Sequence, residues 1–332
     1  MANQNDVPSA EATWRRRVGR AVLLVLALTA LGVVALVIYA GGLGNVARTL
    51  GHLPLAYLLI AILAIAAEWW TDAARFAVMA RPLGIRPRFS WWLKLALANM
   101  CATYAANAGT PITGLLLTRK GVSAGTAFAF ALVQQTLFVP ACLGPACVLT
   151  LLFPHLVAPG AFRATLWLAG LVAFAVIVAL LLLAAWPQAS VRLALWTTRG
   201  RARVAIVDFV TGVSTILRGH PLLLGASVLF SMLNQAAVAA ASVALLHGLG
   251  ATGSAARAWG FSYLLSAVSQ SAPTPGGAGV SEVGGAWLFH GLLPAAAVAV
   301  HLMLWRFFAI QLPILVGGLL LAAELRKPAG ST

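Results

Sequence analysis

The sequence has few charged residues, and acidic residues are the scarcest of them. Asp, Glu, Lys and Arg make up 9% of the 332 residues, and only 7 residues are Asp or Glu. Soluble domains contain about 25% charged residues. The shortage excludes an ordinary soluble domain, because a surface in contact with water needs more charge than this chain supplies.

Cysteine is also sparse, and the motifs of common enzymes are missing. The chain has 3 cysteines, none in a CxxC motif, and no HExxH, P-loop or Rossmann glycine motif. Residues 279–283 (Gly-Val-Ser-Glu-Val) depart from the GxSxG nucleophile elbow at the last position. A disulfide framework and a zinc site are not expected. We therefore predict no enzyme, no cofactor and no metal site, and we expect His301 to be packed or hydrogen-bonded.

Apolar residues dominate what is present. They make up 61% of the chain, and uncharged runs long enough to cross a bilayer recur along its length. These runs predict an all-α polytopic membrane protein with one transmembrane domain over residues 21–325, between tails at residues 1–20 and 326–332. The 22 Lys and Arg residues lie mostly in short connections, which is typical of cytoplasmic loops. We therefore expect cytoplasmic termini, the plasma (inner) membrane, and no nucleic-acid partner.

The basic residues leave too little chain for two crossings between Lys94 and Arg119. The 24 residues between them are fewer than the roughly 40 that two crossings need. We predict instead a re-entrant hairpin that enters from the cytoplasm and turns at residues 107–111, where Asn, Gly and Pro favour a break. A second hairpin, entering from outside, is predicted around the interruption at residues 273–277.

The two halves of the chain then match in opposite orientation. Residues 21–154 and 164–325 are each predicted to hold three full spans and one hairpin. This arrangement is an inverted 4+4 repeat with six full spans and two re-entrant helical hairpins, eight hydrophobic segments in all. Within the second half, residues 190–218 predict an amphipathic cytoplasmic helix that docks either on anionic lipid or on the protein's own underside.

The hairpin tips are the predicted substrate site. Inverted repeats with interrupted helices are typical of transporters, whose substrates bind near mid-membrane at the broken helices. The alternative is that both tips are ordinary helix breaks between packed spans. The candidate substrate-binding residues, all at or beside the tips, are Asn107, Thr110, Pro111, Gly114, Thr274, Pro275, Gly276, Gly277 and Gly279.

Ionisable residues inside the predicted spans also point to function, because charges in a bilayer normally face a partner or a cavity. Arg306 lies about 18 Å along a helix from Pro294, near the bilayer centre, and we predict a buried pair between Arg306 and Glu282. Either Arg306 binds a phosphate oxygen while Glu282 holds it or exchanges a proton, or the pair is structural and pins the hairpin.

A second group of charges shares one helical face. Glu68, Asp72 and Arg75 lie at positions i, i+4 and i+7. Either these residues line a path for a lipid headgroup, or Asp72 and Arg75 form a self-satisfied pair near the inner interface.

Residues 272–282 (Ala-Pro-Thr-Pro-Gly-Gly-Ala-Gly-Val-Ser-Glu) carry a family resemblance. They resemble the Pro-x-Gly-Gly-x-Gly-x-x-Glu signature of the flippase-like membrane family typified by the transmembrane region of lysylphosphatidylglycerol synthase. In that family an arginine follows on the next helix, here Arg306. The first half departs from the family pattern, because residues 111–115 read Pro-Ile-Thr-Gly-Leu where members often have Pro-x-Arg-x-Gly-Glu. Only a short tail follows residue 325, so we expect no synthase domain.

The resemblance implies a protein that moves or accommodates lipids, including aminoacylated phospholipids and isoprenoid-linked or hopanoid-type lipids. We therefore predict a lipid flippase or transporter for an anionic or aminoacylated lipid. The alternative is a non-transporting membrane partner that shelters a lipid for a separate lipid-modifying enzyme. An intramembrane lipid-modifying enzyme would need a nucleophile or metal cluster that the sequence does not present.

Overall fold

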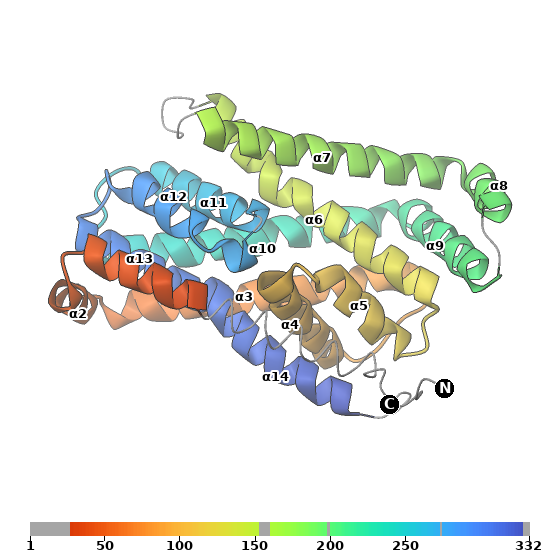
Figure 1. The fold of residues 1–332 in the computed structure, drawn as a ribbon, viewed down its shortest axis with the longest axis horizontal. Coiled ribbons are helices and arrows are strands. Elements are labelled where there is room, and N and C mark those ends of the chain that lie inside the picture. Colours follow the sequence, from red (N-terminus) through yellow and green to blue (C-terminus); the bar gives the residue numbers. More distant parts are fainter. Residues whose placement is uncertain (1–26, 153–159, 198–199, 273, 328–332) are drawn as a thin grey trace, which may run out of the picture.

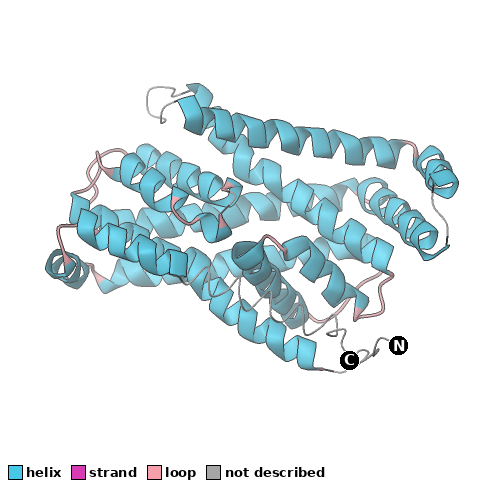
Figure 2. Cartoon of the chain, in the orientation of Figure 1, coloured by secondary structure: helices cyan, strands magenta, loops and turns pink. Residues whose placement is uncertain are grey.

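The computed structural model describes residues 27–152, 160–197, 200–272 and 274–327. Within these residues the regular structure is entirely helical (Figure 2). The early elements are a helix over Ala27–Tyr39, α2 (Leu43–Gly51), α3 (Leu55–Ala80), the short η1 (Arg81–Leu83), α4 (Phe89–Ala106), α5 (Gly109–Thr118) and α6 (Ala124–Leu152). The later elements are α7 (Gly160–Ala185), α8 (Pro187–Thr197), α9 (Gly200–Gly219), α10 (Pro221–Gly248), α11 (Ala255–Ser271), η2 (Pro275–Gly277), α12 (Val280–Phe289), α13 (Ala295–Arg306), the π-helical η3 (Phe307–Gln311) and α14 (Leu312–Arg326).

Several helices are long and apolar enough to cross a membrane, so the chain is a multi-pass membrane protein. Five helices of the described part meet that requirement, and a sixth span results if the bent pair Ala27–Tyr39 and Leu43–Gly51 is one crossing. α7 shows the environment of these helices plainly, since its apolar side chains Leu168, Leu171 and Phe174 are exposed. Apolar side chains on the outside are expected where lipid replaces water as the solvent.

The first predicted hairpin is present as α4, a turn and α5. α4 ends at Ala106 because Asn107 adopts a left-handed conformation with φ of 50°, and α5 begins at Gly109. The turn therefore lies within the predicted residues 107–111. α5 has 10 residues, about 15 Å at 1.5 Å per residue, whereas the hydrocarbon core is about 30 Å thick. The second arm is therefore too short to be a full crossing.

The second hairpin consists of α11, the interruption at η2 and α12. Its arms have 17 and 10 residues, close to the 18 and 10 residues of the first hairpin. Figure 1 shows the two hairpins entering the molecule from opposite ends, with both tips near its middle. η2 contacts α4 directly, so the two tips meet.

The helix contacts of the first half have counterparts in the second half. α3 packs along α10, α4 packs on α14, and α11 packs on α6. Within each half the short arm packs on the following helix, α5 on α6 and α12 on α13. Exchanging the two halves therefore leaves this set of contacts unchanged.

The segment predicted as one amphipathic helix over residues 190–218 contains two helices, α8 and α9, so the prediction of a single helix was wrong. α9 begins at Gly200, which has a φ of +62° that other residues rarely adopt. The apolar face of α9 is covered by the protein, with Val210, Val213 and Ile216 buried and α9 packed on α6. The predicted helix was expected to dock either on anionic lipid or on the protein itself. Within the described residues, α9 docks on the protein.

Buried apolar residues form two clusters that leave a polar region between them. One cluster includes Leu264, Phe289 and Leu302 in the second half, and the other includes Phe76 and Phe130 in the first half. α3 contributes to both clusters. Its Glu68 and Asp72 lie on the stretch between them, and Arg75 follows at the start of the second cluster. The candidate site is on this stretch.

Candidate functional site

A polar cavity lies where the two hairpin tips meet α3. Its volume is about 80 Å³, which is enough for more than one water molecule. Residues from five helices and from both tips line it, and they are Glu68, Asp72, Arg75, Asn99, Met100, Thr103, Tyr104, Asn107, Gln135, Phe138, Asn234, Ser269, Gln270, Ala272, Thr274, Gly276 and Gly277. Sequence analysis identified the tips and the charged face of α3 as separate features, whereas in the structure both line the same cavity.

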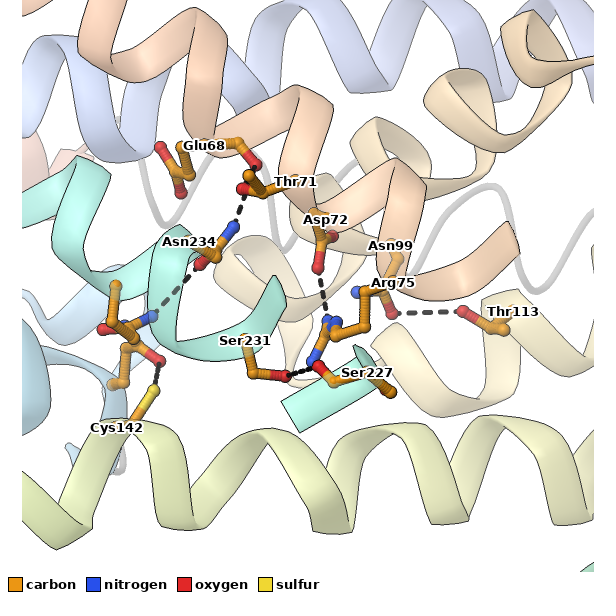
Figure 3. Close-up of polar contacts among 12 residues, drawn as sticks. Glu68, Thr71, Asp72, Arg75, Asn99, Thr113, Cys142, Ser227, Ser231 and Asn234 are labelled. Carbon is orange, nitrogen blue, oxygen red and sulfur yellow. Dashed lines mark hydrogen bonds and ion pairs between the residues drawn. The ribbon is translucent and has the colours of Figure 1, made fainter. Parts of the chain in front are cut away.

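The charged face of α3 supplies the cavity with two carboxyl groups and one guanidinium. Glu68, Asp72 and Arg75 are 2–3% exposed. Arg75 Nη2 donates to Asp72 Oδ1 within an ion pair (Figure 3), as one of the two alternatives from the sequence predicted. The pair is not self-satisfied, however, because Arg75 Nε and Nη1 have no partner among the described residues. The guanidinium also stacks on the ring of Phe138, 4.4 Å from its centroid.

Glu68 differs from Asp72 in having no ion-pair partner among the described residues. Its backbone carbonyl accepts a hydrogen bond of 2.9 Å from Asn234 Nδ2 on α10, as Figure 3 shows. Its carboxyl oxygen Oε2 is buried without a partner in the part of the chain that the structure describes. A buried carboxyl oxygen in this position can be satisfied by a bound proton, a water molecule or a ligand.

Amide and hydroxyl side chains extend the polar region from Glu68 across α10 and α11. Asn234 accepts from Gln235 Nε2 at 3.2 Å, and Gln235 Oε1 accepts from Ser266 at 3.1 Å and from Gln270 at 3.3 Å. Cys142 on α6 donates to Gln270 Oε1 at 3.1 Å. This chain of hydrogen bonds fixes the cavity wall, because each side chain has a defined partner.

The first tip approaches the cavity through a close contact between α5 and α4. A Cβ on Gly109 would lie 2.0 Å from Thr103 Oγ1 and 2.6 Å from Asn99 Oδ1. Asn99 Oδ1 also accepts from Thr113 Oγ1 at 3.1 Å. Glycine at position 109 therefore allows the short arm to lie against the residues that line the cavity.

The second tip is built on glycines in left-handed conformations. Gly276 and Gly277 have φ values of +57° and +67°, and a Cβ on Gly277 would lie 2.6 Å from the carbonyl oxygen of Ser269. Thr274 Oγ1 donates to the carbonyl of Ala278 at 2.8 Å. The tip thus folds back on α11, which explains why the sequence there is rich in glycine.

The predicted pair of Glu282 and Arg306 is present, but it does not line the cavity. Arg306 Nη1 donates to Glu282 Oε1 and to Ser281 Oγ, and both charged residues are buried. Glu282 Oε2 also accepts from the Gly279 amide at 2.8 Å at the start of α12, as in one half of a capping box. Gly32 of the first described helix covers the pair, since a Cβ there would lie 2.3 Å from Glu282 Oε1.

The other predicted site residues divide between the cavity wall and its surroundings. Asn107, Thr274, Gly276 and Gly277 line the cavity. The remaining tip residues do not line it, and these are Thr110, Pro111, Gly114, Pro275 and Gly279. His301, expected to be packed or hydrogen-bonded, has Nε2 3.2 Å from Ser242 Oγ, which confirms that prediction.

Apart from Asn107 and Thr274, the uncharged polar residues of the cavity were not predicted from the sequence. Asn99, Tyr104, Gln135, Asn234 and Gln270 all line it. Within the predicted spans, only ionisable side chains were considered as candidate site residues. A search for side-chain amides inside apolar runs would have found four of these five positions, because amides in a membrane also need partners.

One family matches this sequence over most of its length, whereas none of the curated proteins matches it. The match covers residues 21–317, which includes both hairpins, α3 and Arg306. The chain therefore belongs to the family described as the lysylphosphatidylglycerol synthase TM region.

Proposed function

We propose that this protein is a lipid transporter, a flippase-like carrier that binds a phospholipid headgroup in the cavity between the hairpin tips. The observation that carries the proposal is the guanidinium of Arg75. It is buried at the cavity, and Nε and Nη1 have no partner among the described residues. A guanidinium binds phosphate through parallel N–H donors, so a headgroup phosphate supplies the acceptors that these donors lack.

The uncharged part of the cavity suits the rest of a polar headgroup. Asn107 and Thr274 stand at the two tips, and Asn99 and Gln270 lie on the long arms of the hairpins. These side chains offer both donors and acceptors. The substrate class is therefore an anionic or aminoacylated lipid, whose phosphate binds at Arg75 while its polar substituent faces the amides and hydroxyls.

The proposed movement depends on the two halves being an inverted repeat. Support comes from the contacts, which stay the same when the halves are exchanged, and from the matched hairpin arms. Transporters of this architecture expose a central site to each side in turn by moving one repeat against the other. The two tips would then alternate as the inner and outer walls of the cavity, and the termini would lie in the cytoplasm.

Glu282 and Arg306 have a positioning role in this proposal. Their carboxylate and guanidinium join the start of α12 to the end of α13, and neither residue lines the cavity. The pair therefore holds the second tip in place rather than touching the headgroup. No catalytic step is assigned to the protein.

The test is lipid exchange in vesicles that contain the purified protein and a fluorescent phosphatidylglycerol quenched from outside by dithionite. We expect Arg75→Gln to lower the exchange rate about tenfold or more, because a hydrogen bond to a charged group contributes about 1.5–3 kcal/mol. Arg48→Gln is the matched control, since Arg48 is exposed on α2. Exchange by that control should equal wild type.

A double variant separates transport from folding. Asp72→Asn combined with Arg75→Gln removes the unpaired buried carboxylate that the single change leaves. If Arg75 serves only to neutralise Asp72, the double variant recovers exchange, and the proposed headgroup contact is wrong. Absence of exchange by the wild-type protein, with lipid retained on purification, would instead indicate the sheltering partner of a lipid-modifying enzyme.

A further inference from the structure

We infer that Glu68 is a proton-binding site through which the protein couples headgroup movement to proton movement. The inference rests on the proposed lipid transport and adds the coupling ion. It starts from the placement of the Glu68 carboxyl group, which lines the cavity and is 2% exposed, with Oε2 unpartnered among the described residues. Burial of a carboxyl group with an unpartnered oxygen and no ion-pair partner among the described residues favours the protonated form.

Among the described residues that line the cavity, the charged neighbours of Glu68 are one acid and one base. Asp72 and Arg75 lie on the same face of α3 and bind each other, so the guanidinium already has a carboxylate partner. Tyr104 on α4 and Cys142 on α6 are the other titratable groups near it, and a phenol and a thiol are ordinarily neutral at physiological pH. From α10 and α11 the cavity receives only amides and a hydroxyl. Proton binding at Glu68 therefore decides the net charge of the cavity.

Because of the net charge of the site, proton binding at Glu68 and headgroup binding at Arg75 favour each other. With Glu68 ionised, the three residues of α3 carry one net negative charge, and an anionic phosphate arriving at Arg75 meets repulsion. With Glu68 protonated, the same site is neutral. Positions 68 and 75 are about 10 Å apart along the helix, and unit charges at that distance alter binding by about tenfold in a medium of effective dielectric constant about 20. The coupling is reciprocal, so headgroup binding also favours proton binding.

The step involves no oxidation or covalent change to the lipid. A proton from the aqueous phase on one side binds Glu68 as the headgroup binds Arg75, and both leave when the cavity opens to the other side. A proton gradient would thereby drive net lipid movement in the direction of proton flow.

The experiment measures exchange of fluorescent phosphatidylglycerol in the same vesicles at mildly acidic and at mildly alkaline pH. Wild type should be about tenfold faster at acidic pH when headgroup binding limits the rate. Glu68→Gln, which resembles the protonated side chain, should be independent of pH and as fast as acidic wild type. Glu324→Gln is the matched control, because Glu324 lies at the end of α14 beside Lys327, and it should keep the wild-type pH dependence.

A second measurement keeps the inference open to refutation if Glu68→Gln does not fold. Calorimetry of wild type with short-chain phosphatidylglycerol, in buffers of different ionisation enthalpy, should show net proton uptake on binding. Wild-type exchange that is independent of pH, or that follows Na⁺ instead, would overturn the coupling while leaving lipid transport intact. Absence of wild-type exchange would overturn the transport proposal itself, and the coupling with it.

Discussion

Two buried ion pairs in this chain have the same chemistry but different surroundings. Asp72–Arg75 lines the cavity, and Nε and Nη1 of its guanidinium have no partner among the described residues. Glu282–Arg306 does not line the cavity. Its carboxylate is satisfied by the Gly279 amide, the Ser281 hydroxyl and Arg306, although Arg306 Nε and Nη2 also have no partner among the described residues. Residue type therefore does not distinguish a site from a support. Position relative to the cavity does, because, of the two pairs, only Asp72–Arg75 lines it.

The supporting role of Glu282 leads to a prediction about stability. Glu282→Gln should lower the free energy of unfolding by about 3 kcal/mol, because removing one partner leaves the other charge buried and unpaired. Denaturant unfolding of the detergent-solubilised protein measures this change. The double variant Glu282→Gln with Arg306→Met should recover part of the stability and retain lipid exchange. A stable, folded double variant without exchange would show that the pair acts on the substrate.

At the scale of helices, small residues decide how closely the hairpins and spans approach. α14 lies against α4 at Gly317, where a Cβ would be 2.0 Å from the carbonyl oxygen of Leu97. At the next residue, Gly318, a Cβ would meet only the sulfur of Cys101 at 3.5 Å, an ordinary contact. Close packing through small residues is typical of membrane helices.

These neighbouring glycines form a matched pair for mutation. Gly317→Ala should lower the free energy of unfolding by about 1–3 kcal/mol, because the new methyl group collides with backbone that cannot rotate away. Gly318→Ala should leave stability unchanged or raise it by about 0.5–1 kcal/mol, since alanine is favoured within a helix. Thermal unfolding of both variants in one detergent tests the difference. Equal effects at the two positions would contradict the packing of α4 on α14.

At the scale of the molecule, the hairpins enter from opposite ends and their tips meet in the middle (Figure 1). If the two halves form an inverted repeat, the open ends of the hairpins lie on opposite sides of the membrane. Lys120 follows the short arm of the first hairpin, His290 follows that of the second, and both are exposed.

This geometry predicts the outcome of cysteine labelling in intact cells. In a background without the three native cysteines, His290→Cys should react with an impermeant maleimide added outside. Lys120→Cys should react only after the membrane is permeabilised. Labelling of both positions from one side would rule out opposed hairpins and, with them, the inverted repeat.

Much of the fold was predictable because the bilayer imposes simple rules on length and charge. The α4–α5 turn, the break at η2 and the long spans follow from apolar run length and from Gly, Pro and basic residues. Even the contact between Glu282 and Arg306 was predictable, because each charge in an apolar span needs a partner. The split of residues 190–218 into α8 and α9 was not, because a single glycine at position 200 broke an otherwise helical pattern.

The composition and order of residues by themselves determined that the chain is a membrane protein with two interrupted hairpins. The tertiary structure alone decided which polar residues share a cavity. Asn234 meets the backbone of Glu68 across 166 positions of sequence, and Cys142 meets Gln270 across 128. Helical periodicity places residues on a face of one helix, but it carries no information about which helix lies opposite. Which helices face each other depends on the packing of all the helices together. This packing places Arg75 at the cavity and Arg306 in the ion pair that holds the second tip.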